Sequence, residues 1–196
     1  MKSYRFLFNS MSPFSRKQVY GSETEHTERL QRLDQELYEP VPAWRLHGVV
    51  EALQALRGVP CTVAITMVAA LGDLSRFDTP RALMKCLGLI PSAYASGERR
   101  PQGAITQAGN THARRALVEG AWASRSPAKV SRHVPLRREK QPKIIQDISW
   151  KAQVRLCKRY RQLSARGKHA NIVTVAIARE LAGFMWAIAQ QLPVVA

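Results

Sequence analysis

The sequence predicts a mainly α fold, a helical domain with one glycine-containing helix–helix turn and one Ser-Gly loop that includes a short extended segment. Apolar residues recur at helical spacing in several segments, and glycines and prolines separate these segments. The chain has 196 residues, of which 45% are hydrophobic, so it can form a packed core and is not a disordered chain.

Composition and periodicity divide the chain into four regions: an atypical, loosely ordered start, a coil segment with its linker, a main helical domain and a tail. Their bounds are 1–21, 22–42, 43–190 and 191–196. The start shows no clear periodicity and no continuous apolar stretch, which argues against a secretory signal peptide.

The coil segment begins at Ser22 with the Ser-x-x-Glu form of a capping box. Leu30, Leu33 and Leu37 follow at helical spacing, so a helix is expected to run to Tyr38. A stripe this short either docks on the protein's own core or forms one strand of a coiled coil.

A second helix is expected over 43–56, and an apolar helix is expected to end at Gly72. The residues 58–60 between them resemble a helix-hairpin-helix turn, in which backbone N–H groups face a phosphate at a helix N-terminus. Pro60 stands where a second glycine is usual, so one donor is lost. An ordinary helix–helix connection explains the same residues equally well.

Two further helices are expected from their start signals. Thr79-Pro80 opens one that Gly88 ends, and residues 109–111 cap one that runs from His112 to about Ser124. The stretch between these helices is too polar and too rich in glycine and proline for a helix, so we expect a short strand at 104–106.

The formal net charge is +16, from 30 Lys and Arg against 14 Asp and Glu. Residues 125–168 contain fourteen Lys and Arg and two acids. A domain this basic repels itself unless an anion lies against it. Nucleic acid is therefore the expected partner, ahead of an anionic membrane surface.

A helix is expected over 143–165 within this basic segment. Its predicted apolar stripe is Ile145, Ile148, Ala152, Leu156 and Leu163. Lys151, Arg155 and Lys158 lie on another face of the helix, where we expect contact with nucleic acid rather than simple solvation. The last helix, over 170–190, is apolar but interrupted by charges, which favours a buried core helix over a membrane span.

The loop over 88–100 holds the residues best suited to chemistry. Ser96 precedes a glycine and is followed by Arg99 and Arg100. A serine hydroxyl can form a covalent phosphoserine, and arginines can hold phosphate oxygens and stabilise developing charge. A Ser-Gly pair is far more often a simple turn, and Tyr94 is a competing nucleophile.

Metal and disulfide sites are not expected in this chain. Cys61, Cys86 and Cys157 are odd in number and widely spaced, which is typical of reduced, buried thiols in a cytosolic protein. The histidines and acids show no ligand spacing, so neither a zinc site nor a metal-dependent nuclease centre is predicted.

Three stretches carry a family pattern. The first joins 52–58 to 70–77, the second spans 88–97, 103–106 and 109–122, and the third spans 150–160, 167–168 and 178–184. Over about 43–190, roughly three quarters of its length, the chain resembles the transposases of insertion sequences 110, 116 and 902. The middle stretch is the most specific part of the resemblance.

The resemblance implies an enzyme of DNA transposition and site-specific recombination, located in the bacterial cytoplasm at the nucleoid. Such transposases join a RuvC-like nuclease domain, whose acids bind Mg²⁺, to a helical C-terminal domain. A coiled coil between the two supports homo-oligomers. A serine of the C-terminal domain attacks DNA, and a structured bridge RNA selects the DNA sites. The implied partners are therefore DNA and bridge RNA, without a membrane.

The family's serine falls on Ser96 in this chain. Many relatives have two serines before the glycine, and Ala95 replaces the first, so Ser96 is the nucleophile if the second serine acts. Asn110, Arg114 and Arg115 match the helix start after the loop and are expected to face DNA. Together with the arginines of the loop and the basic helix face, they form the predicted nucleic-acid site.

No RuvC-like half precedes Ser22, so we expect a truncated transposase that is inactive alone and holds no cofactor of its own. The alternative is a non-catalytic nucleic-acid-binding remnant or regulator that co-assembles with intact transposase. A host helix-hairpin-helix protein is a third reading, but it would not explain the Ser-Gly loop.

Overall fold

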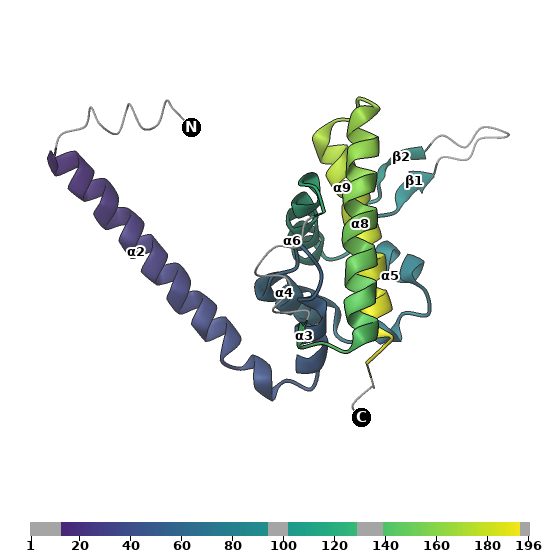
Figure 1. The fold of residues 1–196 in the computed structure, drawn as a ribbon, viewed down its shortest axis with the longest axis horizontal. Helices are drawn as coiled ribbons and strands as arrows, with labels where there is room; N and C mark the ends of the chain where they lie inside the picture. Colours follow the sequence, from purple (N-terminus) through teal and green to yellow (C-terminus); the bar gives the residue numbers. More distant parts are fainter. Residues whose placement is uncertain (1–12, 94–101, 129–138, 193–196) are drawn as a thin grey trace. The chain divides into compact units, whose positions relative to one another are not determined.

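The computed structural model describes residues 13–93, 102–128 and 139–192. The chain forms two compact units, Met1–Ala43 (unit 1) and Trp44–Ala196 (unit 2). The prediction of a mainly α fold is confirmed (Figure 1). Unit 1 contains α2 (Pro13–Tyr38) and the 3-10 turn η1 (Val41–Ala43). Unit 2 contains α3 (His47–Leu53), α4 (Cys61–Leu71), the 3-10 turn η2 (Leu74–Arg76), α5 (Pro80–Cys86), β1 (Pro91–Ala93), β2 (Gln102–Ile105), α6 (Thr111–Ala121), the 3-10 turn η3 (Trp122–Arg125), α8 (Lys143–Ala165) and α9 (Ala170–Ala189).

Helix α2 is longer than predicted. It begins at Pro13 rather than at the capping box of Ser22, so residues 13–21 belong to the helix. A proline is compatible with a helix start because its missing N–H has no intrahelical partner at that position. The predicted leucine stripe is exposed, with 63% of Leu30, 52% of Leu33 and 37% of Leu37 accessible.

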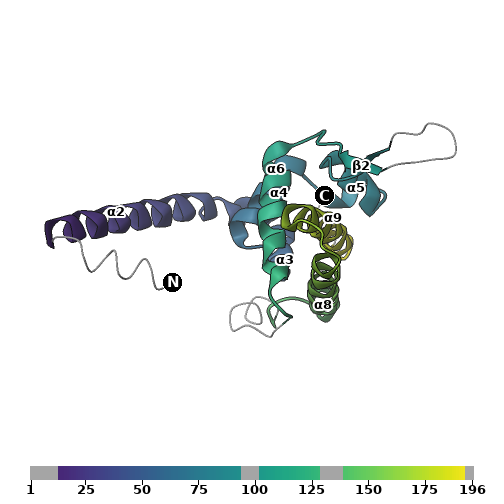
Figure 2. The ribbon, with the colours of Figure 1, turned by 90° about the horizontal axis from the view of Figure 1, so that it is seen from above.

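Unit 2 is built around α9, which packs against α3, α5, α6, α8 and η2. Viewed from above, α9 lies among these helices (Figure 2). Its residues Val173, Ile177, Leu181, Met185 and Ile188 recur at helical spacing and are almost completely buried. Among the described helices, α9 alone is long and apolar enough to cross a membrane, but half of it is buried inside the unit. The expectation of a core helix is therefore supported.

The turn between α3 and α4 packs directly against α6. Helix α3 covers less than the predicted 43–56, because 3-10 hydrogen bonds replace the α pattern after Leu53. Gly58 then adopts φ +82°, and a Cβ atom there would overlap the carbonyl oxygen of Gly120 in α6. Pro60 serves as the N-cap of α4. The glycine of the predicted hairpin turn thus allows a close approach of two backbones.

Helix α5 and the strands that follow it match the sequence signals. The Thr79 hydroxyl accepts a hydrogen bond from the Ala82 N–H and caps α5. Strand β1 pairs antiparallel with β2, with Pro91 opposite Ile105 and Ala93 opposite Gln102. The extended segment expected at 104–106 is therefore confirmed at 104–105, which lie in β2, while its partner strand was not predicted.

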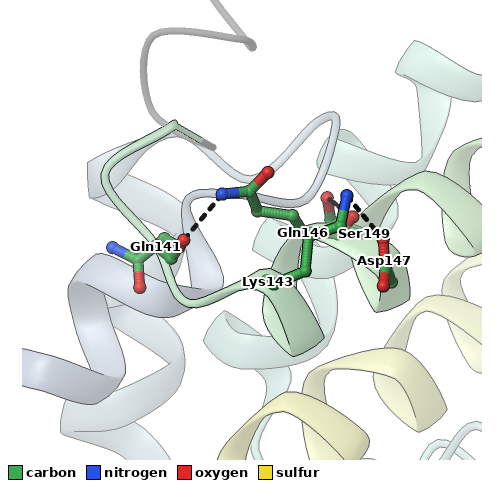
Figure 3. Close-up of polar contacts among 5 residues, drawn as sticks. All are labelled: Gln141, Lys143, Gln146, Asp147 and Ser149. Atoms are coloured by element: carbon green, nitrogen blue, oxygen red, sulfur yellow. Dashed lines mark hydrogen bonds and ion pairs between the residues drawn. The ribbon is translucent and has the colours of Figure 1, made fainter.

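Helix α8 has the predicted bounds, and polar contacts hold its first turns (Figure 3). The Gln146 side-chain amide donates to the Gln141 carbonyl at 2.8 Å, and the Ser149 hydroxyl donates to the Gln146 carbonyl at 3.0 Å. The Lys143 ammonium lies 3.3 Å from the Asp147 carboxylate. The first of these contacts ties Gln141 to the first turn of α8, and the other two lie within the helix.

The buried face of α8 is rotated relative to the predicted apolar stripe. Ile148 and Leu163 are only half-buried, whereas Ser149 and Gln153 are buried. The buried residues are Ile145, Ser149, Ala152, Gln153, Leu156, Cys157 and Tyr160. The stripe was partly wrong because the face turned to α9 includes small or hydrogen-bonded polar side chains as well as apolar ones.

Replacing Gly58 by alanine is expected to lower the free energy of unfolding by about 2 kcal/mol or more. The reason is that the substitution adds strain at positive φ and overlap with the α6 backbone. Urea unfolding followed by circular dichroism measures the change. The control is Gly48→Ala in α3, where nothing lies within 4 Å of the added atom, and stability should hold or rise by up to about 1 kcal/mol. Equal stability of both variants would contradict this account.

Candidate nucleic-acid interface

The predicted nucleophile loop lies between β1 and β2. Ser96, Arg99, Arg100 and the competing Tyr94 lie outside the described residues. The strands on either side are described, and the Ser92 hydroxyl donates to the Ala104 carbonyl at 2.9 Å across them. Both ends of the loop are thereby held at one place in unit 2.

Backbone contacts close the root of this hairpin just after the end of α5. The Thr106 N–H donates to the Ile90 carbonyl at 2.9 Å, and the Gln107 N–H donates to the Gly88 carbonyl at 3.1 Å. Gly88 adopts φ +65°, and a Cβ atom there would overlap the backbone of Ala108. The turn before β1 therefore depends on a glycine.

The residues expected at the start of α6 have structural contacts in this unit. The Asn110 side-chain oxygen accepts the Ala113 N–H at 2.9 Å and caps the helix. Arg114 donates to the Leu87 carbonyl at 3.2 Å, which ties α6 to the end of α5. Arg115 is 79% exposed and lies 3.0 Å from Glu119 one turn later. Arg115 thus points to solvent, while Arg114 is engaged with the hairpin root.

The three predicted basic residues of α8 lie together on an open groove, which we call the α8 groove. Lys151, Arg155 and Lys158 are exposed, and all three line it. The structure adds Arg159 and the exposed Trp150 to the same groove, whose volume is about 830 Å³. Four cations therefore face one surface of unit 2.

One carboxylate from α9 organises two of these cations. The Glu180 Oε2 atom lies 2.8 Å from the Arg155 Nε atom, and its Oε1 atom lies 3.4 Å from the Arg159 Nε atom. The Glu180 side chain is 18% exposed. Its contact with Arg159 is an ion pair and not a hydrogen bond, because the buried Arg159 Nε atom has no hydrogen-bond partner. The count of charges within 125–168 could not include this carboxylate, because Glu180 comes from another helix.

A second groove adjoins the first, and we call it the hairpin-root groove. Arg81 and Lys85 of α5 and Arg179 of α9 line it, and it extends to Pro91 at the start of β1. Sequence reasoning missed these cations, because each is isolated along the chain. A third basic groove, with Trp122, Arg125, Arg161 and Lys168 on its walls, lies between α8 and η3.

The buried thiol of α8 is a poor nucleophile. Burial raises the pKa of Cys157, and the nearby guanidinium groups of Arg57 and Arg161 oppose this rise only in part. A raised pKa leaves the thiol protonated at neutral pH, and the thiolate is the reactive form. Arg57 also donates to the Pro127 carbonyl at 2.8 Å, so its role is structural. In the part of the chain that is described, no three His, Cys, Asp or Glu side chains gather as metal ligands.

Comparisons with known proteins agree with the family pattern seen in the sequence. Residues 50–134 match the model of the transposase IS116/IS110/IS902 family. The chain is 49% identical over 153 residues to a Sinorhizobium fredii protein named as a transposase (y4qE), covering 78% of this chain and 39% of that protein. It is 30% identical over 91 residues to the transposase for insertion sequence element IS1111A of Coxiella burnetii, covering 46% of this chain and 23% of that protein.

A Pseudomonas aeruginosa protein named as a family 20 transposase is 26% identical over 160 residues, which is 82% of this chain and 40% of that protein. The chain therefore spans about two fifths of the length of the first two relatives. The matched family segment contains α4, α5, both strands and α6, so the Ser96 loop lies inside it.

Proposed function

We propose that this chain, which belongs to the IS116/IS110/IS902 transposase family through residues 50–134, is the serine-bearing, nucleic-acid-binding domain of such a transposase. Its function would be DNA transposition by site-specific recombination. The observation that carries the proposal is the α8 groove beside the hairpin that presents the Ser96 loop. The chain would hold nucleic acid on unit 2 and bring a phosphodiester to that loop.

Electrostatics support the binding half of the proposal. Lys151, Arg155, Lys158 and Arg159 line the α8 groove, and in the part of the chain that the structure describes Glu180 is the one acid beside them. Lysine and arginine on an exposed face neutralise phosphates and release the counterions condensed on nucleic acid, which makes binding favourable and dependent on salt. No sequence preference follows from such contacts, because phosphates are the same at every base.

The chemical half of the proposal concerns Ser96. Its Oγ atom would form a bond to phosphorus while the bond from phosphorus to the leaving strand's sugar oxygen breaks. The hydroxyl proton would pass to a base, and the leaving oxygen would take up a proton. Arg99 and Arg100 would stabilise the charge that develops on the phosphate oxygens. The product is a phosphoserine that a second strand can attack.

Further partners are proposed on the family resemblance. A bridge RNA would share the basic surface with DNA, and Mg²⁺ would be bound by the nuclease half found in the family. The described residues of this chain do not offer a metal-ligand cluster, so we assign no metal step to them. A non-catalytic regulator that binds the same nucleic acids remains the second candidate, because Arg114 and Asn110 already serve structural contacts.

Binding to duplex DNA should weaken steeply as salt rises, and Lys151→Ala and Lys158→Ala should each lower affinity several-fold. Each substitution removes about one phosphate contact, so the slope of log affinity against log salt should fall by about 0.9. Fluorescence anisotropy with two unrelated duplexes measures both effects, and the loss should be the same for each sequence.

The matched control is Lys143→Ala. Lys143 lies on the same helix and is 82% exposed, but it pairs with Asp147 and lies outside the α8 groove. Affinity of this variant should change little. A flat salt response, or an equal loss for all three variants, would contradict the assignment of the α8 groove.

Ser96→Ala should abolish strand exchange while binding stays nearly unchanged. The test reaction contains this chain, a nicked DNA substrate and the metal-binding nuclease half of a relative. Loss of one surface hydroxyl normally costs less than about 0.5 kcal/mol, whereas loss of a nucleophile removes the covalent route. The readout is a covalent protein–DNA adduct, located by peptide mass mapping.

Tyr94→Phe is the control, because it removes the competing hydroxyl and keeps the ring. This variant should still form the adduct on Ser96. An adduct on Tyr94 or Ser92, or full activity of Ser96→Ala, would favour the non-catalytic candidate or another nucleophile.

Homo-oligomers are proposed to form through the exposed leucine stripe of α2. The double substitution Leu30→Ser and Leu33→Ser should shift the molar mass measured by light scattering toward that of the monomer, since both side chains are more than half exposed. Gln35→Ser on the opposite face is the control and should leave the mass unchanged. A monomeric parent chain would rule out this role for the stripe.

A further inference from the structure

The α8 groove and the hairpin-root groove adjoin each other. Both are lined by Arg155 and by Glu180, so these two side chains mark where the grooves join. Viewed from above, α9 lies between α8 and α5 (Figure 2), and its residue Glu180 lines both grooves. The path along the two grooves begins at Trp150 on α8 and ends at Pro91, the first residue of β1.

The charge along this path favours a phosphate chain over its full length. Lys151, Arg155, Lys158 and Arg159 line the first part, and Arg81, Lys85 and Arg179 line the second. Among the described residues, Glu180 is the one acidic side chain that lines either part. Positive charge along a groove tracks a nucleic-acid backbone.

Trp150 indicates that the bound segment is unpaired. Its side chain is 42% exposed beside Lys151, and Val154 one turn later is exposed to the same extent. An exposed indole beside cations is the arrangement on which unpaired bases stack, because every base has a flat face. Bases inside a duplex are stacked on one another and cannot reach such a ring.

Glu180 orients the arginines at the join. It contacts both Arg155 and Arg159 through their Nε atoms, at 2.8 and 3.4 Å. A guanidinium bound through Nε keeps its Nη hydrogens for a second acceptor, and a phosphate accepts two of them at once. Glu180 thus positions the Arg155 guanidinium by a hydrogen bond and attracts Arg159 by charge, where the two grooves join.

We propose that these two adjoining grooves together bind an unpaired nucleic-acid segment, with one base stacked on Trp150 and its phosphates running past Arg155 to the β1–β2 hairpin. The inference rests on the proposed function, since it assumes that unit 2 binds nucleic acid. It adds the class of ligand, a single strand, and the path that the strand takes. DNA and RNA share this chemistry, and the experiment separates them.

The test compares the full chain with Trp150→Leu and Trp150→Phe. The probes are fluorescein-labelled twelve-nucleotide single strands of DNA and of RNA, and the corresponding DNA duplex, measured by anisotropy at one salt concentration. Trp150→Leu should weaken binding of at least one single strand about tenfold, the usual effect of losing one stacked base. Trp150→Phe keeps a ring and should recover most of this loss, and duplex binding should stay within twofold. The single strand with the larger loss identifies whether DNA or RNA occupies the groove.

Trp122→Leu is the matched control. Trp122 is 36% exposed and lies beside arginines, as Trp150 lies beside cations, but it lines the third groove. It should leave single-strand affinity within twofold, and thermal unfolding should confirm that every variant is folded. Unchanged single-strand binding by Trp150→Leu, an equal loss for duplex and single strand, or a larger loss for Trp122→Leu would each overturn the inference while leaving the proposed function intact. Failure of the parent chain to bind any of the three probes would overturn both.

Discussion

Helix α9 buries Val173, Ile177 and Leu181 among α3, α5, α6 and α8, and the placement of the basic surfaces depends on this burial. Each fully buried aliphatic side chain stabilises the fold by about 1.5–3 kcal/mol relative to an exposed one. Because α9 contacts most of the other helices, it sets their spacing as well as their stability. Arg179 and Glu180 sit on the same helix, so the core and the grooves share one element.

The charge distribution explains how a chain of net charge +16 can stay folded. Asp147 pairs with Lys143, Glu119 pairs with Arg115, and Glu180 contacts two arginines. The exposed pairs contribute little, because solvent screens them. Lysines and arginines also gather on the walls of the three grooves, where repulsion between like charges is relieved when phosphates bind. A bound anion should therefore stabilise the folded state as well as occupy the surface.

Local signals predicted much of unit 2. Thr79 and Asn110 accept the capping hydrogen bonds expected of them, and Gly58 and Gly88 stand at turns with positive φ. These predictions succeeded because each depends on a few neighbouring residues. The predicted start of α2 was wrong because a Ser-x-x-Glu sequence can also occur inside a helix, and here the helix begins before it. The face of α8 was partly wrong because close packing against α9 admits Ser149 and Gln153.

The sequence by itself determined the fold class, the helix of 143–165, the basic face of Lys151, Arg155 and Lys158, and the family pattern around the Ser96 loop. Periodicity, caps and local charge carry that information within a few turns of chain. Only the tertiary structure decided that Glu180 joins Arg155 and Arg159, and that cations of α5 extend their groove to the hairpin. The physical reason is that Glu180 is 21 residues from Arg159 and 25 from Arg155, and the α5 cations are at least 70 residues from either arginine. These groups become neighbours only when α5 and α8 pack on α9.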